Sequence, residues 1–197
     1  RLAMALYESG DFSAADQCVG ELEQLGRELG PAWRVRPLFF RSMRALIDGR
    51  FADADQFQRD LQAVFEVLDP AEFHSTWQMH QLFRLAVTGR DAELLAALEE
   101  ARAAMRGTPI EHQGGDRVLV SFLVAMAGDL PRAREYLAAL PDRALGYPDR
   151  GLTFCAAMAV GRCGDARRAA LVEAVLATFD QPFASQGLIG ISVDGPI

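Results

Sequence analysis

The hydrophobic pattern of this chain repeats around five glycines that lie 36 to 40 residues apart: Gly10, Gly49, Gly89, Gly128 and Gly164. An apolar residue lies four positions before each glycine, and further apolar residues lie 5, 8 and 12 positions after it. The later offsets advance in steps of three and four, so they mark one face of an α-helix. Seven positions before the glycine the residue is small in four of the five units, as two closely packed helices require.

Each period therefore predicts a hairpin of two helices with the glycine at the turn. Glycine adopts the left-handed conformation that ends many helices at little cost. Asp11, Asp129 and Asp165 directly follow their glycines and are expected to cap the second helix. Prolines are expected to end each unit, because proline cannot continue a helix. They are Pro31, Pro70, Pro109, Pro141 and Pro182.

The pattern predicts ten helices in a single all-α domain that covers 1–197. The predicted helices are 1–9, 11–29, 36–48, 51–68, 72–88, 91–106, 115–127, 130–140, 150–163 and 165–179. The repeats are about 1–31, 32–70, 71–109, 110–146 and 147–182, and the glycine-rich tail 183–197 is not helical in pattern. A single hairpin cannot bury its apolar face, so neighbouring hairpins are expected to stack.

Charge and composition narrow the classes of partner. The chain has 20 basic and 27 acidic residues, a net charge of −7, which disfavours nucleic acid and anionic membranes as partners. No apolar run approaches the roughly 18 residues of a membrane span. Three cysteines at irregular spacing favour a reducing cytoplasm over a disulfide framework. Because Arg1 opens directly on a helical pattern, we expect the chain to be a fragment of a larger protein.

The residues that could carry chemistry form no recognisable active site. His74 and His80 are six apart, which places them on different sides of a helix, and His112 stands alone. Cys155 and Cys163 are too far apart on one helix to hold a metal together, so we interpret them as buried apolar residues. No glycine-rich phosphate loop is present. We therefore expect no catalytic residue, no metal and no cofactor, and do not expect an enzyme.

The pattern of a small residue, a glycine seven positions later and an alanine five beyond it resembles the tetratricopeptide repeat. The usual unit of about 34 residues is shorter than these. Units of this length, with phrases such as Ala45 to Ala54, resemble the repeat regions of large bacterial regulators: ATP-dependent LuxR-type activators, antibiotic-regulatory activators and some adenylate/guanylate cyclases. The resemblance covers essentially the whole chain. It implies a right-handed superhelix of about five helix–turn–helix repeats, a TPR-like solenoid.

The resemblance also implies a concave surface, formed by the first helix of each repeat. Phenylalanine, methionine and valine occupy the positions that would face it, and we call these eight residues the Phe/Met ladder: Phe39, Met43, Met79, Phe83, Val118, Phe122, Phe154 and Met158. Such side chains suit an adaptable groove for a peptide, a helix or a small ligand. The alternative is that a tight superhelix packs them against neighbouring first helices.

We therefore expect a non-catalytic interaction or ligand-sensing module of a bacterial cytoplasmic signalling or transcription regulator. A protein or peptide segment, or a small-molecule inducer, would bind in the concave groove. The alternative is a structural spacer or a homo-oligomerisation scaffold without a groove ligand.

Overall fold

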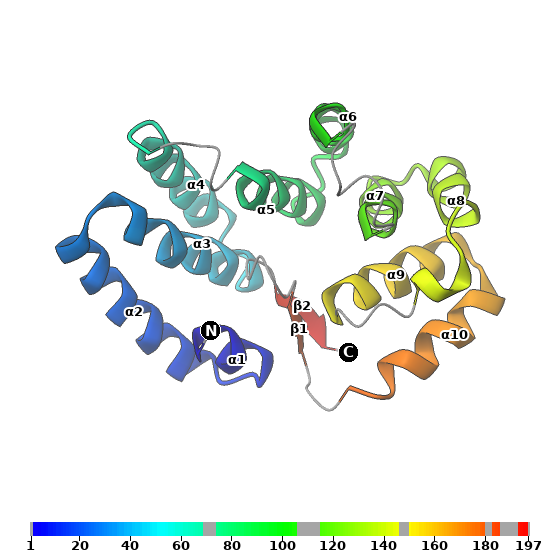
Figure 1. Cartoon of the computed structure of the whole chain (residues 1–197), viewed down its shortest axis with the longest axis horizontal. Coiled ribbons are helices and arrows are strands. Elements are labelled where there is room, and N and C mark those ends of the chain that lie inside the picture. Colours follow the sequence, from blue (N-terminus) through cyan, green and yellow to red (C-terminus); the bar gives the residue numbers. More distant parts are fainter. Residues whose placement is uncertain are drawn as a thin grey trace. The chain divides into compact units, whose positions relative to one another are not determined.

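The computed structural model describes residues 2–68, 74–105, 115–145, 150–179, 183–185 and 193–196. Over these ranges the chain is almost entirely helical, which confirms the all-α class (Figure 1). Close contacts group the residues into two compact units within the predicted domain 1–197. The first is Arg1–His80 with Gln181–Pro196, and the second is Gln81–Asp180 with Ile197.

The first unit contains two complete hairpins, the start of a third and a short strand pair. Its elements are α1 (Leu2–Glu8), α2 (Phe12–Leu29), α3 (Pro31–Ile47), α4 (Phe51–Phe65), the beginning of α5 (His74–Val87), β1 (Phe183–Ser185) and β2 (Val193–Pro196). Helix α3 packs against both α2 and α4, and α1 packs against α2.

The second unit continues α5 and adds the last helices. These are α6 (Asp91–Met105), α7 (Gly115–Met126), α8 (Leu130–Ala138), the 3₁₀ helix η3 (Asp142–Ala144), α9 (Arg150–Cys163) and α10 (Ala166–Leu176). Helix α7 lies against α8 and α9, and α9 lies against α10. Four of the five predicted hairpins therefore have packed helices in the described residues: α1–α2, α3–α4, α7–α8 and α9–α10.

The five hairpins have the same type of turn, and the structure confirms the role predicted for the glycine in it. All five repeat glycines have positive φ, between 68° and 80°. In the second hairpin the Gly49 amide donates to the Leu46 carbonyl and the Arg50 amide to the Ala45 carbonyl. The same two hydrogen bonds recur at the other four glycines, and together they form the Schellman motif.

The residue after each glycine begins the second helix in one of two ways. The carboxylates of Asp11, Asp129 and Asp165 accept a hydrogen bond from the amide three residues on, as predicted. The other two hairpins have arginine there. Arg50 and Arg90 each pair with an acidic residue three positions later, so the helix start carries an ion pair in place of a cap.

Aromatic and small residues fill the interior of the first unit. The Tyr7 ring stacks on Phe40 with centroids 5.8 Å apart, and both pack with Val19 and Met43. Ala3 and Ser42, two of the predicted small positions, are 2% and 0% exposed. Small side chains at these positions let the helices approach closely.

Helix α7 forms the centre of the second unit. Each residue from 118 to 125 on α7 is buried, which is the pattern of a helix covered on several sides. The Phe122 ring lies 5.6 Å from the Phe83 ring of α5, centroid to centroid. Arg102 of α6 donates to the Tyr136 hydroxyl of α8 at 2.5 Å, which ties these two helices together.

Helix α3 begins five residues earlier than predicted. Pro31 was expected to end a unit, but it is the first residue of α3, and only Gly30 separates α3 from α2. Proline suits the first turn of a helix, because the amide that it lacks has no partner there. The prediction of a helix over 36–48 was wrong at its start for this reason.

The tail contains structure that the pattern did not predict. Strands β1 and β2 pair antiparallel, with Ala184 opposite Asp194 and Ser185 opposite Val193, and β1 lies beside α1. The remaining tail residues, and Pro70, Pro109 and Pro182 at three of the predicted repeat exits, lie outside the described residues.

Candidate functional site

Most of the Phe/Met ladder lies in the interior. Five of its eight side chains are at most 5% exposed: Phe39, Met43, Phe83, Val118 and Phe122. The other three, Met79, Phe154 and Met158, are half-buried. Phe39 lies edge-on to His80 with ring centroids 5.2 Å apart, and Phe83 contacts Phe122.

This burial is the packing that the alternative interpretation of the ladder describes. In this conformation, neighbouring helices cover the five enclosed side chains, so these offer no open surface to a ligand. Ligand binding at Met79, Phe154 and Met158 stays a prediction.

The histidine and cysteine side chains in the described part of the chain are structural. His80 is 1% exposed, and its Nε2 lies 2.8 Å from the Ser42 hydroxyl. Cys155 and Cys163 are buried thiols outside any disulfide, as predicted, and burial raises the pKa of Cys163. The His74 side chain and all of His112 lie outside the described residues.

Within the described ranges, no three His, Cys, Asp or Glu side chains gather where they could hold a metal ion. No helix in this part of the chain has the length and apolar character needed to cross a membrane.

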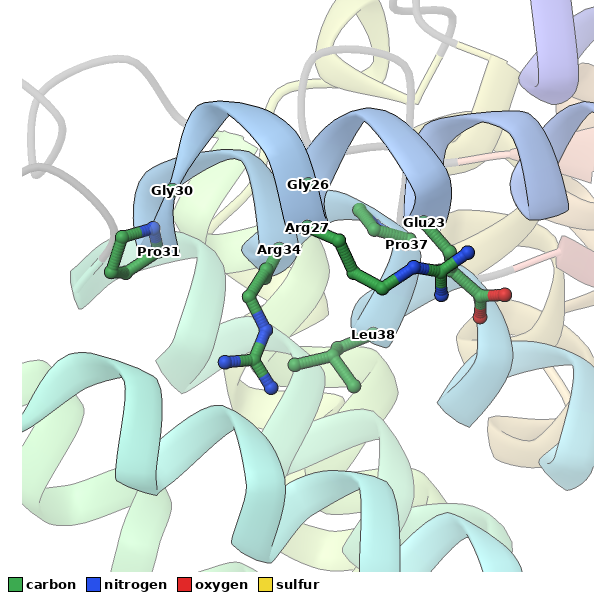
Figure 2. Close-up of a pocket in the computed structure, with 8 residues that line it drawn as sticks. All are labelled: Glu23, Gly26, Arg27, Gly30, Pro31, Arg34, Pro37 and Leu38. Carbon is green, nitrogen blue, oxygen red and sulfur yellow. The ribbon is translucent and has the colours of Figure 1, made fainter.

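An open groove of about 520 Å³ lies beside α2 and α3, and we call it the first groove (Figure 2). Helix α2 and the α2–α3 turn contribute Glu23, Gly26, Arg27 and Gly30, and α3 contributes Pro31, Arg34, Pro37 and Leu38. The groove is mainly apolar, with charged side chains from both helices along it. Its volume falls within the range of ligand sites in proteins.

A row of ion pairs joins α2 to α3 next to the first groove. The Arg41 guanidinium donates to both carboxylate oxygens of Glu23, at 2.8 and 3.1 Å. Asp16 lies 3.3 Å from Arg44 and 3.9 Å from Arg41. The hydrogen bond from Arg41 to Glu23 is also the main reason why the pKa of Arg41 is raised. Every charge in this row has an opposite charge beside it.

The row ends at two arginines that form no ion pair with a described residue, although Glu23 lines the same groove. Arg27 and Arg34 are both exposed, and neither guanidinium has a hydrogen bond or ion pair with any described residue. Figure 2 shows Arg27 on α2, and Arg34 and Leu38 on α3, along the groove. The first groove thus combines an apolar lining with one carboxylate, Glu23, which pairs with Arg41, and two arginines that form no ion pair.

A second groove of about 490 Å³ lies beside α8, α9 and α10 and contains three arginines. All three have partners. Arg134 donates to the Cys163 carbonyl, and Arg167 pairs with Asp142 at 2.5 Å. Arg168 is 8% exposed and donates to the carbonyls of Leu137 and Leu140 and to Asp142. These arginines hold the fold together.

Sequence reasoning missed Arg27 and Arg34. A signal was present, because Arg34 precedes Arg41 by seven residues and Arg27 follows Glu23 by four, which continues the faces that form the row. Reading that signal requires knowing which faces of α2 and α3 meet. The α3 start at Pro31, which the pattern placed wrongly, also decides where Arg34 lies.

Comparisons of the chain with protein families, with curated proteins and with solved structures found no match.

Proposed function

We propose that this chain is a non-catalytic module that binds a segment of a partner protein, built as a TPR-like solenoid. The shared hairpin turn supports the solenoid. Five glycines with the same φ sign and the same pair of hydrogen bonds give each hairpin the same local geometry, and like hairpins stack in a regular array. We also propose that the hairpins stack as a regular, right-handed superhelix.

The observation that carries the binding role is the first groove. It is open and mainly apolar, and it holds two arginines whose guanidinium groups make no hydrogen bond or ion pair with a described residue. A surface of this kind loses unfavourable apolar exposure when a peptide covers it. Its size suits a few side chains of a bound segment.

We place the module in a bacterial cytoplasmic signalling or transcription regulator, as the repeat resemblance implies. Three free cysteines fit a reducing compartment. Binding would act by equilibrium: a segment that prefers one arrangement of the hairpins biases the module toward it, and the parent protein responds. A small-molecule inducer is the second candidate ligand.

An unbiased peptide selection tests the binding role. Peptides displayed on phage are enriched on the purified 197-residue chain, synthesised and measured by fluorescence anisotropy. Hydrogen–deuterium exchange then maps the bound site. We expect enriched peptides to slow exchange at the end of α2 and the start of α3, and Leu38→Ser to weaken their binding.

Leu171→Ser is the matched control, because Leu171 is 42% exposed on α10 and does not line the first groove. Circular dichroism checks that both variants keep their helicity. Enrichment of no peptide would contradict the binding role. Concentration-dependent self-association in light scattering, without peptide binding, would favour the oligomerisation scaffold.

A further inference from the structure

We propose that the first groove binds an acidic, apolar-anchored segment of a partner protein, with a carboxylate held between Arg27 and Arg34. A neighbouring apolar side chain of the segment lies against Pro31 and Leu38. This inference rests on the proposed function and adds the chemistry of the partner.

The charge pattern across the α2–α3 interface is the first observation that favours an acidic ligand. Helix α2 supplies acids and α3 supplies arginines along the row, so Glu23 and Arg41 form a bidentate pair. At the end of the row, α2 supplies Arg27 where another acid would complete the pattern, opposite the arginine side of α3. An acidic group from outside the chain would complete the row.

The position of Arg34 in its helix is the second observation that favours an acidic ligand. Arg34 is the fourth residue of α3, near the helix end where the backbone dipole is positive and a cation is unfavourable. Arg27 lines the same groove and adds like-charge repulsion. The Arg34 guanidinium makes no ion pair there, and a bound carboxylate would be favoured by both arginines and by the dipole of α3.

Gly26 explains how the two arginines come to share one groove. A Cβ on Gly26 would lie 3.1 Å from Cγ of Arg34 and 3.2 Å from the Trp33 carbonyl oxygen. The glycine therefore lets the start of α3 approach α2 closely. Arg27 from α2 and Arg34 from α3 line the groove together with Pro31 and Leu38.

The partner chemistry follows from the guanidinium groups and from the net charge. Arginine presents a planar fork of donors that matches the two oxygens of a carboxylate. The chain carries a net charge of −7, which repels an extended polyanion such as a nucleic acid. A short segment with few carboxylates is attracted by Arg27 and Arg34 and buries its apolar side chain in the groove. Because it carries few negative charges, the net charge of the chain repels it less than it repels a polyanion.

The test uses the 197-residue chain and three fluorescein-labelled peptides of equal length. The first is composed of leucine and glutamate; the second has glutamine for every glutamate, and the third has serine for every leucine. The test variant is Arg27→Glu with Arg34→Glu. Its control, matched in net charge, is Arg36→Glu with Arg143→Glu, since both of these arginines are exposed and without a partner among the described residues.

We expect the leucine–glutamate peptide to bind more tightly than the other two, and its binding to weaken with added salt. The test variant should lose at least about tenfold in affinity and the control less than about twofold. A peptide of leucine and lysine should bind the test variant better than the control. Because the two variants have the same net charge, this gain would report the two groove positions, and misfolding of the test variant would not produce it.

Three results would overturn the inference: equal binding of the glutamine peptide, equal losses in the test variant and its control, or a dimer of the chain that the acidic peptide dissociates. The last would assign the first groove to a second copy. If phage-selected peptides bind but ignore Arg27→Glu/Arg34→Glu, this inference fails and the proposed function stands. If no peptide of any composition binds, both fail.

Discussion

The two grooves are similar in size and both contain arginines, yet their arginines serve different purposes. In the second groove, Arg168 is 8% exposed and donates to two backbone carbonyls and to Asp142. In the first groove, Arg27 and Arg34 are exposed and contact no acid or carbonyl among the described residues. A fold that needs an arginine buries it and satisfies its donors.

The difference teaches how to separate structural charges from functional ones in a helical repeat. Arg168 crosses from α10 to the end of α8, where the last carbonyls of a helix lack partners within the helix. Arg27 and Arg34 join no two helices by a hydrogen bond or ion pair among the described residues. Surface charges that neither cap a helix nor join two helices are the ones available to a partner.

The largest expected effect is in the second groove. Arg168→Met removes the side-chain donor to the Leu140 carbonyl and one of the donors to the Leu137 carbonyl, which still accepts from the Leu140 amide, so we expect the free energy of unfolding to fall by about 2 kcal/mol. Urea denaturation followed by circular dichroism measures it. A loss below about 0.5 kcal/mol would contradict the structural role of Arg168.

The row beside the first groove should weaken at alkaline pH. Tyr7 is fully buried and donates to Asp16 at 2.9 Å, and its pKa is raised above the ordinary 10.0, first by burial and then by that hydrogen bond. The unfolded chain therefore loses this proton before the folded chain does. Stability is retained below pH 10 and falls above it, by up to about 1.4 kcal/mol per pH unit.

Denaturation series between pH 8 and pH 11 measure this slope. Tyr7→Phe keeps the ring but removes the titrating group, so the variant should show a flatter curve over the same range. An equal slope in both proteins would assign the alkaline loss to another group.

A pair of glycine variants tests whether close backbone approach is special to the first groove. Gly26→Ala would crowd the Trp33 carbonyl, so we expect a loss of about 1 kcal/mol. Gly161→Ala, on α9, meets nothing within 4 Å and should stabilise the chain by about 0.5 kcal/mol. Thermal unfolding compares them, and a shift of the same sign in both would contradict the close approach.

Asp142, which pairs with two arginines of the second groove, should titrate below its usual range. The hydrogen bond from Arg167, followed by the one from Arg168, lowers the pKa of Asp142 from its ordinary 3.8. Its contribution to stability is therefore present above that value and is lost as the pH falls below it. NMR titration of the Asp142 carboxyl measures the pKa, and Arg167→Gln should return it toward 3.8.

The smallest expected effect is on the stability of the first groove itself. Arg34→Gln removes an exposed charge without a partner, so the free energy of unfolding should change by less than about 0.5 kcal/mol. Urea denaturation beside Arg168→Met makes the contrast direct. A large loss would show that Arg34 serves the fold, which would weaken its assignment to a partner.

Much of the fold could be predicted from the sequence because the hairpin turn is local. Its glycine, the two hydrogen bonds around it and the aspartate cap all involve residues at most five positions apart. The burial of Cys155 and Cys163 also followed from their residue type and helical setting. The ladder was recognised as a pattern, but not the enclosure of five of its side chains.

What the sequence by itself determined is therefore the series of hairpins, since helix starts, turns and apolar faces depend on neighbours along the chain. Only the tertiary structure decided which charges meet: Asp142 reaches Arg168 across 26 residues, Glu23 reaches Arg41 across 18, and Arg27 and Arg34 are left over. A pairing of this kind depends on the angle and offset at which two helices pack. Those are fixed by the shapes of all the side chains between them, which no local pattern contains.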